Sequence, residues 1–244
     1  MTSVEFWDRV FREGDRTAYS RVAMPKQDDP VLQAACKHFG DVQDKTLVDL
    51  GCGNGAASLF FASRGANVLS IDVSAHAIRN LTDFCAQHDI QNVRPFPMSA
   101  EDIRSLEPVH FVFGSMILHH IEPFASFAST LASVLLSGGK GFFWENNASS
   151  GTLIWFRQHV VGRWWVPKFG DNQEFPLTVS EIESLREHFR VEVEYPELYY
   201  FRLASDYLLR GRLKAPFQWL DRVCYAIPWL RRRSYRQYVY LWAR

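Results

Sequence analysis

The sequence predicts an α/β fold: a mostly parallel, doubly wound sheet with helices on both of its faces. From about residue 30 to residue 147, strand-like runs alternate with helix-like segments at intervals of about 20–25 residues. Parallel strands need crossover connections of that kind, because the chain must return to the same edge before it pairs again. Polar and glycine-rich residues directly follow the predicted strands, where parallel sheets bind ligands. These observations predict a single domain over residues 1–244.

Short apolar or alternating runs predict seven strands. They cover residues 46–50, 67–72, 93–99, 109–117, 140–146, 190–195 and 234–242. Several of the helices between them have recognisable starts: Asp29 with Pro30, Ser74, and the capping-box pair Thr178 and Glu181. The helices are expected over residues 28–39, 56–65, 74–87, 122–136 and 178–189. After residue 147 the alternation of strands and helices stops. Residues 148–177 have no clear hydrophobic period, and a mostly helical stretch of about 35 residues separates the last two strands.

Composition and charge narrow the possible classes of function. Basic and acidic side chains are equal at 27 each, so the net charge gives no support to a nucleic-acid partner. The last 44 residues differ, with 10 basic and 2 acidic side chains. The four cysteines form no CxxC pair, which argues against a metal site or a disulfide framework and favours a reducing compartment. The N-terminus has charges where a signal peptide needs an apolar core, and no apolar run reaches the roughly 18 residues of a membrane span. We therefore expect a cytoplasmic protein.

The stretch "LVDLGCGNG" (47–55) allows two interpretations. Gly51, Gly53 and Ala56 satisfy the glycine pattern of dinucleotide-binding folds, and Asp72 lies about 20 residues further on, where an acid binds ribose hydroxyls. S-adenosylmethionine (SAM) has the same ribose, so Asp72 fits either cofactor. Asp49 favours SAM, since a carboxylate repels a pyrophosphate but suits the ammonium and sulfonium charges of SAM. The repeated glycines also predict a loop more open than a pyrophosphate requires.

Five segments follow one another in order: "LVDLGCGNG", "VLSIDVS", "MSAEDI", "FGSMILHHI" and "LLSGGKGFFWEN". As a set they resemble the class I SAM-dependent methyltransferases of the small-molecule type, over roughly residues 40–147. The resemblance implies a Rossmann-like seven-stranded sheet with SAM as the cofactor, S-adenosylhomocysteine (SAH) as the product, and an insertion on the substrate side after the fifth strand. An NAD(P)-dependent oxidoreductase and a non-catalytic SAM-binding module remain as alternatives.

The resemblance also implies a set of cofactor-binding residues. Asp49 would lie near the amino group of SAM and Asp72 at its ribose, while Ser99 stands where the family often has an acid that contacts adenine. An N-terminal lid over residues 1–30 would contribute Tyr19 and Arg21, Arg21 as a partner of the cofactor carboxylate. The complete set is Tyr19, Arg21, Asp49, Gly51, Cys52, Gly53, Asp72, Val73, Ser99, Ala100, Glu101 and Ser115.

The residues that would act on the methyl acceptor follow the fourth and fifth strands. Methyl transfer to a hydroxyl requires a base, and histidine titrates near neutrality, so His119 and His120 are candidates. Glu145 could orient a histidine or bind substrate. One of the histidines could instead cap or pack the helix that follows, and Glu145 could be a strand-end carboxylate at the rim of the pocket. Two histidines favour methylation at oxygen, although nitrogen or carbon acceptors need less help from a base.

The resemblance places substrate beside an insertion at residues 148–177 and beside residues 178–244, which contain an aromatic and basic helical stretch. Six of the eight tryptophans come after residue 150, and three arginines follow the helical pattern at 217–227. Core packing with a solvated basic end, a membrane-surface or lipid-linked substrate site, and nucleic-acid binding all remain possible. The neutral net charge and the lack of an RNA-binding module weaken the last. We expect a small or lipid-like substrate, no nucleic-acid partner and a possible peripheral membrane contact.

Overall fold

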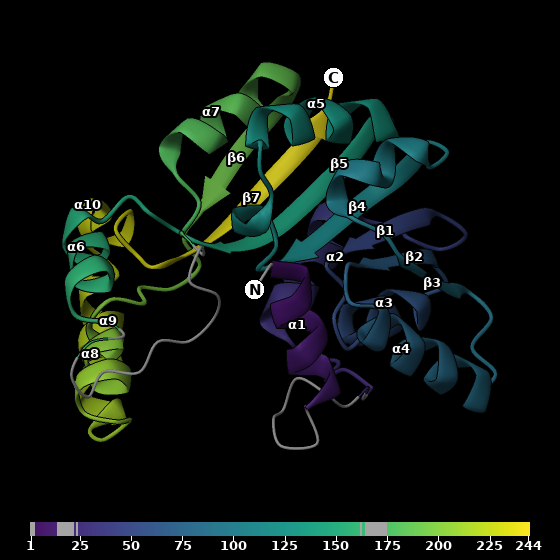
Figure 1. Ribbon diagram of the computed structural model, residues 1–244. Helices are drawn as coiled ribbons and strands as arrows, with labels where there is room; N and C mark the ends of the chain where they lie inside the picture. Colours follow the sequence, from purple (N-terminus) through teal and green to yellow (C-terminus); the bar gives the residue numbers. More distant parts are fainter. Residues whose placement is uncertain (1–2, 14–21, 23, 162, 164–174) are drawn as a thin grey trace.

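The computed structural model describes residues 3–13, 22, 24–161, 163 and 175–244. It contains a seven-stranded sheet in the order β3-β2-β1-β4-β5-β7-β6, in which only β7 runs antiparallel to its neighbours (Figure 1). The strands are β1 Thr46–Leu50, β2 Asn67–Asp72, β3 Val93–Pro97, β4 Val109–Ser115, β5 Leu135–Asn146, β6 Phe189–Glu194 and β7 Arg236–Ala243. The predicted α/β fold is confirmed, and all seven predicted strands are present.

Helices cover both faces of this sheet. On one face lie α2 (Pro30–Phe39), α3 (Ala56–Ala62) and α4 (Ala75–Gln87), which form an apolar core with the rings of Phe113 and Phe142. On the other face lie α5 (Phe124–Val134) and α7 (Val179–His188), packed on Phe143 and Val239. Phe142 and Phe143 are adjacent in β5 and point to opposite faces, as the two-residue period of a strand requires.

The predicted helix starts are present. The side chain of Asp29 accepts from the backbone N–H groups of Val31 and Leu32, at 2.9 and 3.1 Å. Thr178 and Glu181 form the expected capping box. The helix predicted over 122–136 ends at Val134, because Leu135 already pairs with Val109 and starts β5 five residues early. The "SGG" stretch is therefore an irregularity within β5, with Gly138 at φ +76°, and not a loop between helix and strand.

Four helices stand apart from the sheet at the left of Figure 1, and we call them the helical arm. They are α6 (Gly151–His159), α8 (Phe201–Leu208), α9 (Lys214–Cys224) and α10 (Pro228–Arg231). The sequence predicted the helical stretch before β7 but gave no period for α6. The carboxylate of Asp221 in α9 accepts from the first backbone N–H groups of α8, which joins the two helices. Among the described residues, no helix is both long and apolar enough to cross a bilayer.

Candidate functional site

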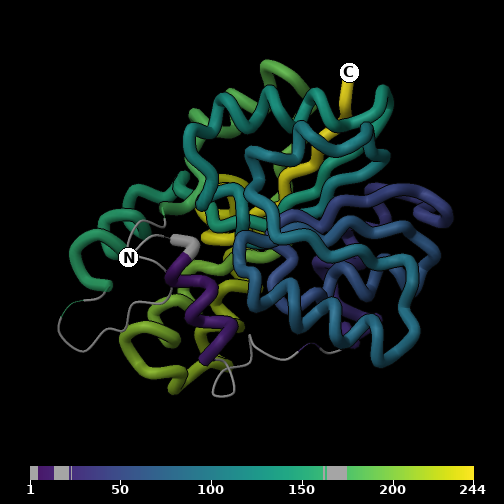
Figure 2. The backbone as a smooth tube through the Cα atoms, turned by 45° about the vertical axis from the view of Figure 1, so that its right-hand side comes forward, coloured from purple at the N-terminus to yellow at the C-terminus, as the bar shows by residue number. Residues whose placement is uncertain are grey.

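Within the described part of the chain, the residues singled out by sequence gather at the edge where the parallel strands end. The loops after β1, β2, β4 and β5 all open there, since parallel strands point the same way. A helix that the sequence analysis missed, α1 (Ser3–Arg12), lies beside this edge in both views (Figures 1 and 2). Its signal was present in "VEFWDRVF", where aromatic residues recur at helical spacing.

The glycine loop after β1 needs its glycines for both conformation and space. Gly51 has φ +69° and Gly53 has φ +50°, a region that other residues rarely adopt. A Cβ atom on Gly51 would lie 2.8 Å from the side chain of Ile117, and one on Gly53 would lie 3.1 Å from Phe11. The loop thus passes close under the segment after β4 and under α1. A compact ligand could contact the backbone itself at this point.

Asp72 closes the loop from the end of β2. One carboxylate oxygen accepts from Gly53 N at 2.9 Å, and the other accepts from Ser74 N at 2.8 Å. Burial raises the pKa of Asp72, while the backbone donors of Ser74 and Gly53 oppose that shift. Each oxygen keeps a further lone pair, so the carboxylate can accept from a diol as well.

Asp49 is buried inside the sheet just before the loop. Its carboxylate accepts from the Ser58 hydroxyl at 2.6 Å, and Ser58 in turn accepts from Ser70 at 2.7 Å. Burial raises the pKa of Asp49 to about 7, with a smaller contribution from the charge of Asp72; the Ser58 hydrogen bonds lower it only in part. A cation arriving at this end of the sheet would therefore be favoured.

The remaining cofactor candidates are less uniform. Val73 is exposed beyond β2, and the Ser99 hydroxyl donates to Asp102 at 2.8 Å. Ala100 and Glu101 begin a 3₁₀ helix, η2 (Ala100–Ser105). Cys52 is buried in the loop, and burial raises the pKa of its thiol. Ser115 ends β4, and Tyr19 and Arg21 lie outside the described residues.

Glu145 and His119 form a buried pair. Glu145 is fully buried at the end of β5, and one carboxylate oxygen accepts from Ile117 N and Leu118 N at 2.8 and 2.7 Å. The other oxygen lies 2.6 Å from Nδ1 of His119, whose side chain is 3% exposed. With the carboxylate ionised, Nδ1 carries the proton and donates it to Glu145, which makes Nε2 the basic nitrogen. Sequence reasoning named both residues, and the structure brings them together across the β4–β5 pair.

His120 joins this pair to α1. Its ring centre lies 4.2 Å from that of His119 and 5.6 Å from that of Trp7, edge to face. Asp8 fixes the same helix to the start of α4, where its carboxylate accepts from Ser74 Oγ and from His76 N at 3.0 and 3.1 Å. The predicted lid segment therefore includes a helix held at both the glycine loop and the histidines, through contacts that no local pattern indicates.

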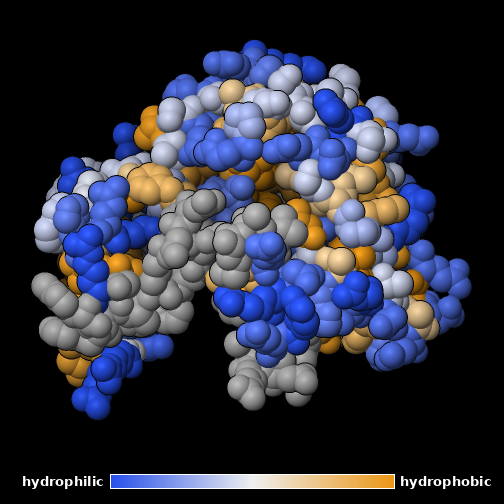
Figure 3. Space-filling view, in the orientation of Figure 1, coloured by the Kyte–Doolittle hydropathy of each residue, from blue (hydrophilic) through white to orange (hydrophobic). Residues whose placement is uncertain are grey.

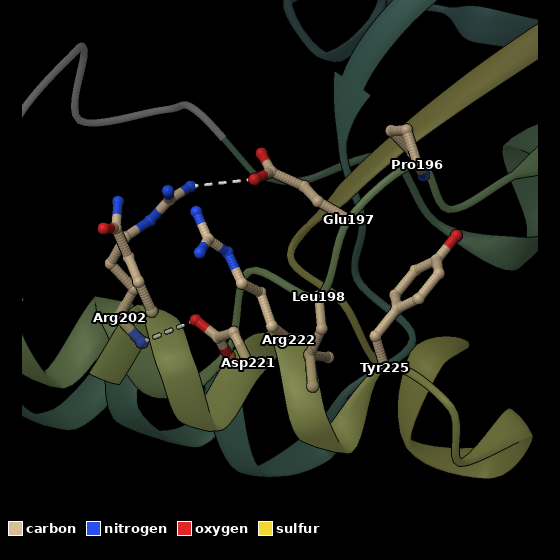
Figure 4. Close-up of a pocket in the computed structure, with 8 residues that line it drawn as sticks. Pro196, Glu197, Leu198, Arg202, Asp221, Arg222 and Tyr225 are labelled. Carbon is tan, nitrogen blue, oxygen red and sulfur yellow. Dashed lines mark hydrogen bonds and ion pairs between the residues drawn. The ribbon is translucent and has the colours of Figure 1, made fainter. Parts of the chain in front are cut away.

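A further hollow lies away from this edge. A pocket of about 280 Å³ lies on the helical arm, between the 196–198 segment and helices α8 and α9 (Figure 4). Arg202, Glu197 and Arg222 meet at its mouth, with Arg202 paired to Glu197 at 3.0 Å. It contains none of the strand-end residues, so it is not the place where the cofactor candidates converge.

Comparison with known proteins agrees with this geometry. A family model described as a methyltransferase domain matches residues 47–139, which run from β1 into β5. A ubiquinone biosynthesis O-methyltransferase of Rickettsia canadensis is 22% identical over 197 residues, covering 79% of this chain and 82% of the relative. Residues 47–139 thus match a methyltransferase domain, and the comparisons support a SAM-dependent methyltransferase. The predicted cofactor is confirmed with it, and the oxidoreductase alternative finds no support.

Solved structures bear out the fold of this methyltransferase. A geranyl diphosphate C-methyltransferase of Streptomyces coelicolor, solved with SAH, superposes with a TM-score of 0.61 at 15% identity, over 100% of this chain and 98% of that one. The [4+2]-cyclase SpnF superposes with a TM-score of 0.65, also at 15% identity, over 100% and 96%. A C-methyltransferase and a cyclase on one fold show that the acceptor must be inferred from the site and not from the architecture.

Proposed function

We propose that this methyltransferase transfers the methyl group of SAM to an oxygen atom of a small or lipid-like molecule, with His119 as the general base. The observation that carries the proposal is the buried His119–Glu145 pair at the ends of β4 and β5. The Rickettsia canadensis relative is named an O-methyltransferase, which supports oxygen as the acceptor atom.

The cofactor would lie along the strand ends. Its methionyl part would lie along Gly51, Cys52 and Gly53. Its ammonium group would lie near Asp49 in β1. Asp72 would accept from the ribose hydroxyls with the lone pairs that Gly53 N and Ser74 N leave. The other candidates at this end would border the adenine or the methionine carboxylate: Val73, Ser99, Ala100, Glu101, Ser115, Tyr19 and Arg21.

The acceptor hydroxyl must lose its proton as the methyl group arrives. SAM, when bound, supplies a methyl group on a positively charged sulfur that leaves readily. Glu145 keeps the proton of His119 on Nδ1 and holds the ring in one orientation. Nε2 then takes the proton from the acceptor, and Glu145 stabilises the imidazolium that results. His120 and Trp7 would act as the packing that excludes water, with α1 as part of the lid.

Replacement of His119 tests this role. His119→Ala should slow single-turnover methylation by about 100-fold or more, the usual contribution of a positioned base, while SAH affinity stays within about threefold. Glu145→Gln should slow it less, because an amide still orients the ring but stabilises the imidazolium poorly. His88→Gln, an exposed histidine at the end of α4, is the matched control. Unchanged turnover in His119→Ala would reject the assignment, and SAH binding without turnover on hydroxylated acceptors would favour a non-catalytic module.

We also propose that the helical arm contacts a membrane surface, from which a lipid-like acceptor would enter. Trp219, Val223 and Ile227 share one side of α9 and its C-terminal extension, at 61%, 53% and 38% exposure. Basic side chains border them, including Arg222 and Arg231–Arg233, all exposed. Figure 3 shows apolar and strongly hydrophilic residues side by side over this part of the molecule. Aromatic residues beside arginines suit the headgroup region of an anionic bilayer.

A further inference from the structure

Arg236 is a cation at the strand-end edge that no step above uses. It begins β7 directly opposite Asn146, the residue after Glu145 in β5. Its Nη1 atom donates to Asn146 Oδ1 at 2.8 Å and lies 3.2 Å from the sulfur of Met116, three residues before His119. Asn146, which the guanidinium contacts, directly follows Glu145, the residue that holds the proposed base, in β5.

Aromatic rings surround this guanidinium. Its carbon lies 4.8 Å from the ring centre of Trp144, 5.4 Å from that of Tyr199 and 5.9 Å from that of Tyr235. These rings come from β5, from the segment before α8 and from the residue before β7. They leave Arg236 half-buried and give the space around it flat apolar walls.

Much of the donor capacity of Arg236 is unused. A guanidinium has five N–H groups, and the hydrogen bonds of Arg236 involve only Nη1. Within the described part of the chain, Nε and Nη2 have no acceptor, and no carboxylate lies within 4 Å of the group. No buried side-chain nitrogen or oxygen in that part lacks a partner, so these unused N–H groups reach solvent.

Nε and Nη2 lie on one edge of the planar guanidinium of Arg236. Nε–H and an Nη2–H point in parallel, which is the geometry that receives two oxygens of a carboxylate or phosphate at once. A half-buried cation without a counter-ion is costly, and an anion arriving with a ligand would offset that cost. Arg157, which donates to the Tyr235 hydroxyl at 3.1 Å, brings a second positive charge to that ring.

We propose that Arg236 binds an anionic oxygen group of the methyl acceptor, a carboxylate or a phosphate, between the rings of Trp144, Tyr199 and Tyr235. The acceptor then carries two functional groups: a hydroxyl that reaches His119 and an acidic group that Arg236 holds. This deepens the proposed function and rests on it for the position of the hydroxyl. The acidic group sets which hydroxyl is presented, and thereby the regiochemistry of methylation.

Binding measurements separate this proposal from methyl transfer itself. The SAH-saturated protein is titrated calorimetrically with benzoate, with its neutral isostere benzamide and with phenyl phosphate. Benzoate or phenyl phosphate should bind at least about tenfold more tightly than benzamide, the usual contribution of charge-assisted hydrogen bonds. Arg236→Gln should abolish that preference, and Arg236→Lys, which keeps the charge without the fork, should retain part of it. The better of the two anions distinguishes a carboxylate from a phosphate.

Controls make the result decisive. Arg190→Gln removes an exposed arginine of β6 and should leave the preference intact. SAH affinity should stay within about twofold in every variant, which shows that the fold is retained. Equal affinity for benzoate and benzamide, an unchanged preference in Arg236→Gln, or no detectable anion binding at millimolar concentrations would overturn the proposal. None of these outcomes depends on turnover, whereas a failure of the proposed function would appear as unchanged turnover in His119→Ala with the anion preference intact.

Discussion

The cofactor end of the sheet and the helical arm differ in which side chains they bury and which they expose. At the cofactor end, polar side chains are buried and each has a partner: Asp49 with Ser58, Asp72 with two backbone donors, and Glu145 with two backbone donors and the His119 ring. On the arm, apolar side chains are exposed. Seven of the twelve large hydrophobic residues found exposed in the described chain lie on or between its helices, so the excess is local to the arm.

The difference separates two tasks of one enzyme. A buried polar network fixes atoms in place, which a cofactor common to a whole family requires. Exposed apolar helices contribute little to the stability of the free chain but can bury surface against a partner. If the cofactor end and the arm work independently, changes at one should leave the binding function of the other intact.

The largest effect is expected when Asp72 is replaced. Asp72→Ala removes the acceptor of Gly53 N and Ser74 N together with the proposed ribose contact, so SAH affinity should fall by about 100-fold or more. Isothermal titration with SAH measures the loss. Asp83→Ala, an exposed acid on α4, is the matched control, and a loss of less than threefold in Asp72→Ala would contradict the role assigned to this carboxylate.

A smaller effect is expected when Asp221, the buried acid of the arm, is replaced. Its carboxylate accepts from Tyr200 N, Phe201 N and Arg202 N at 3.2, 2.8 and 3.0 Å. Asp221→Ala should destabilise the α8–α9 pair by about 1–2 kcal/mol, the usual cost of a lost N-terminal cap. Amide hydrogen exchange should then speed up in 200–224 but not in β1 or β4. Unchanged SAH affinity is expected, and a parallel loss of SAH binding would show that the arm and the cofactor end are coupled.

The raised pKa of Asp49 predicts how the stability of the apo protein depends on pH. Because burial raises its pKa to about 7, the folded apo protein binds a proton that the unfolded chain releases near pH 4. This group therefore makes the apo protein progressively less stable as the pH rises from about 4 to about 7. Asp49→Asn keeps an acceptor for Ser58 and should raise the melting temperature more at pH 8 than at pH 4.

The same carboxylate should report on cofactor binding. If the ammonium group of SAM favours ionised Asp49, then binding at pH 6 releases up to about one proton per SAM. Calorimetry in two buffers of different ionisation enthalpy measures that release. Asp49→Asn should abolish it, and equal release in the variant would place the proton on another group.

The two regions also differ in how far sequence could predict them. The first strand was predicted residue for residue, and Asp72 could be placed at its strand end, because both depend on a run of a few neighbouring residues. The pairing of His119 with Glu145 could be suggested only because both residues follow predicted strands. The environment of Arg236 could not be predicted, since Met116, Trp144 and Tyr199 are distant in sequence and meet only through the β5–β7 pairing and the arm. The docking of α1 through Trp7 and Asp8 likewise depends on contacts that are absent from any local pattern.

The smallest effects are expected on the arm, where several side chains share one contact. Val223→Ser and Trp219→Ser should each weaken binding to vesicles of phosphatidylcholine with phosphatidylglycerol by about threefold to tenfold, as loss of one inserted side chain predicts. Val179→Ser is the matched control, because Val179 is 60% exposed and lies in α7, outside the four helices of the arm. Vesicles without the anionic lipid should bind weakly in every case, since the surrounding arginines then lose their counter-charge. Equal effects of Val223→Ser and Val179→Ser, or equal binding to both vesicles, would mean that the exposed side of the arm receives something other than an anionic membrane.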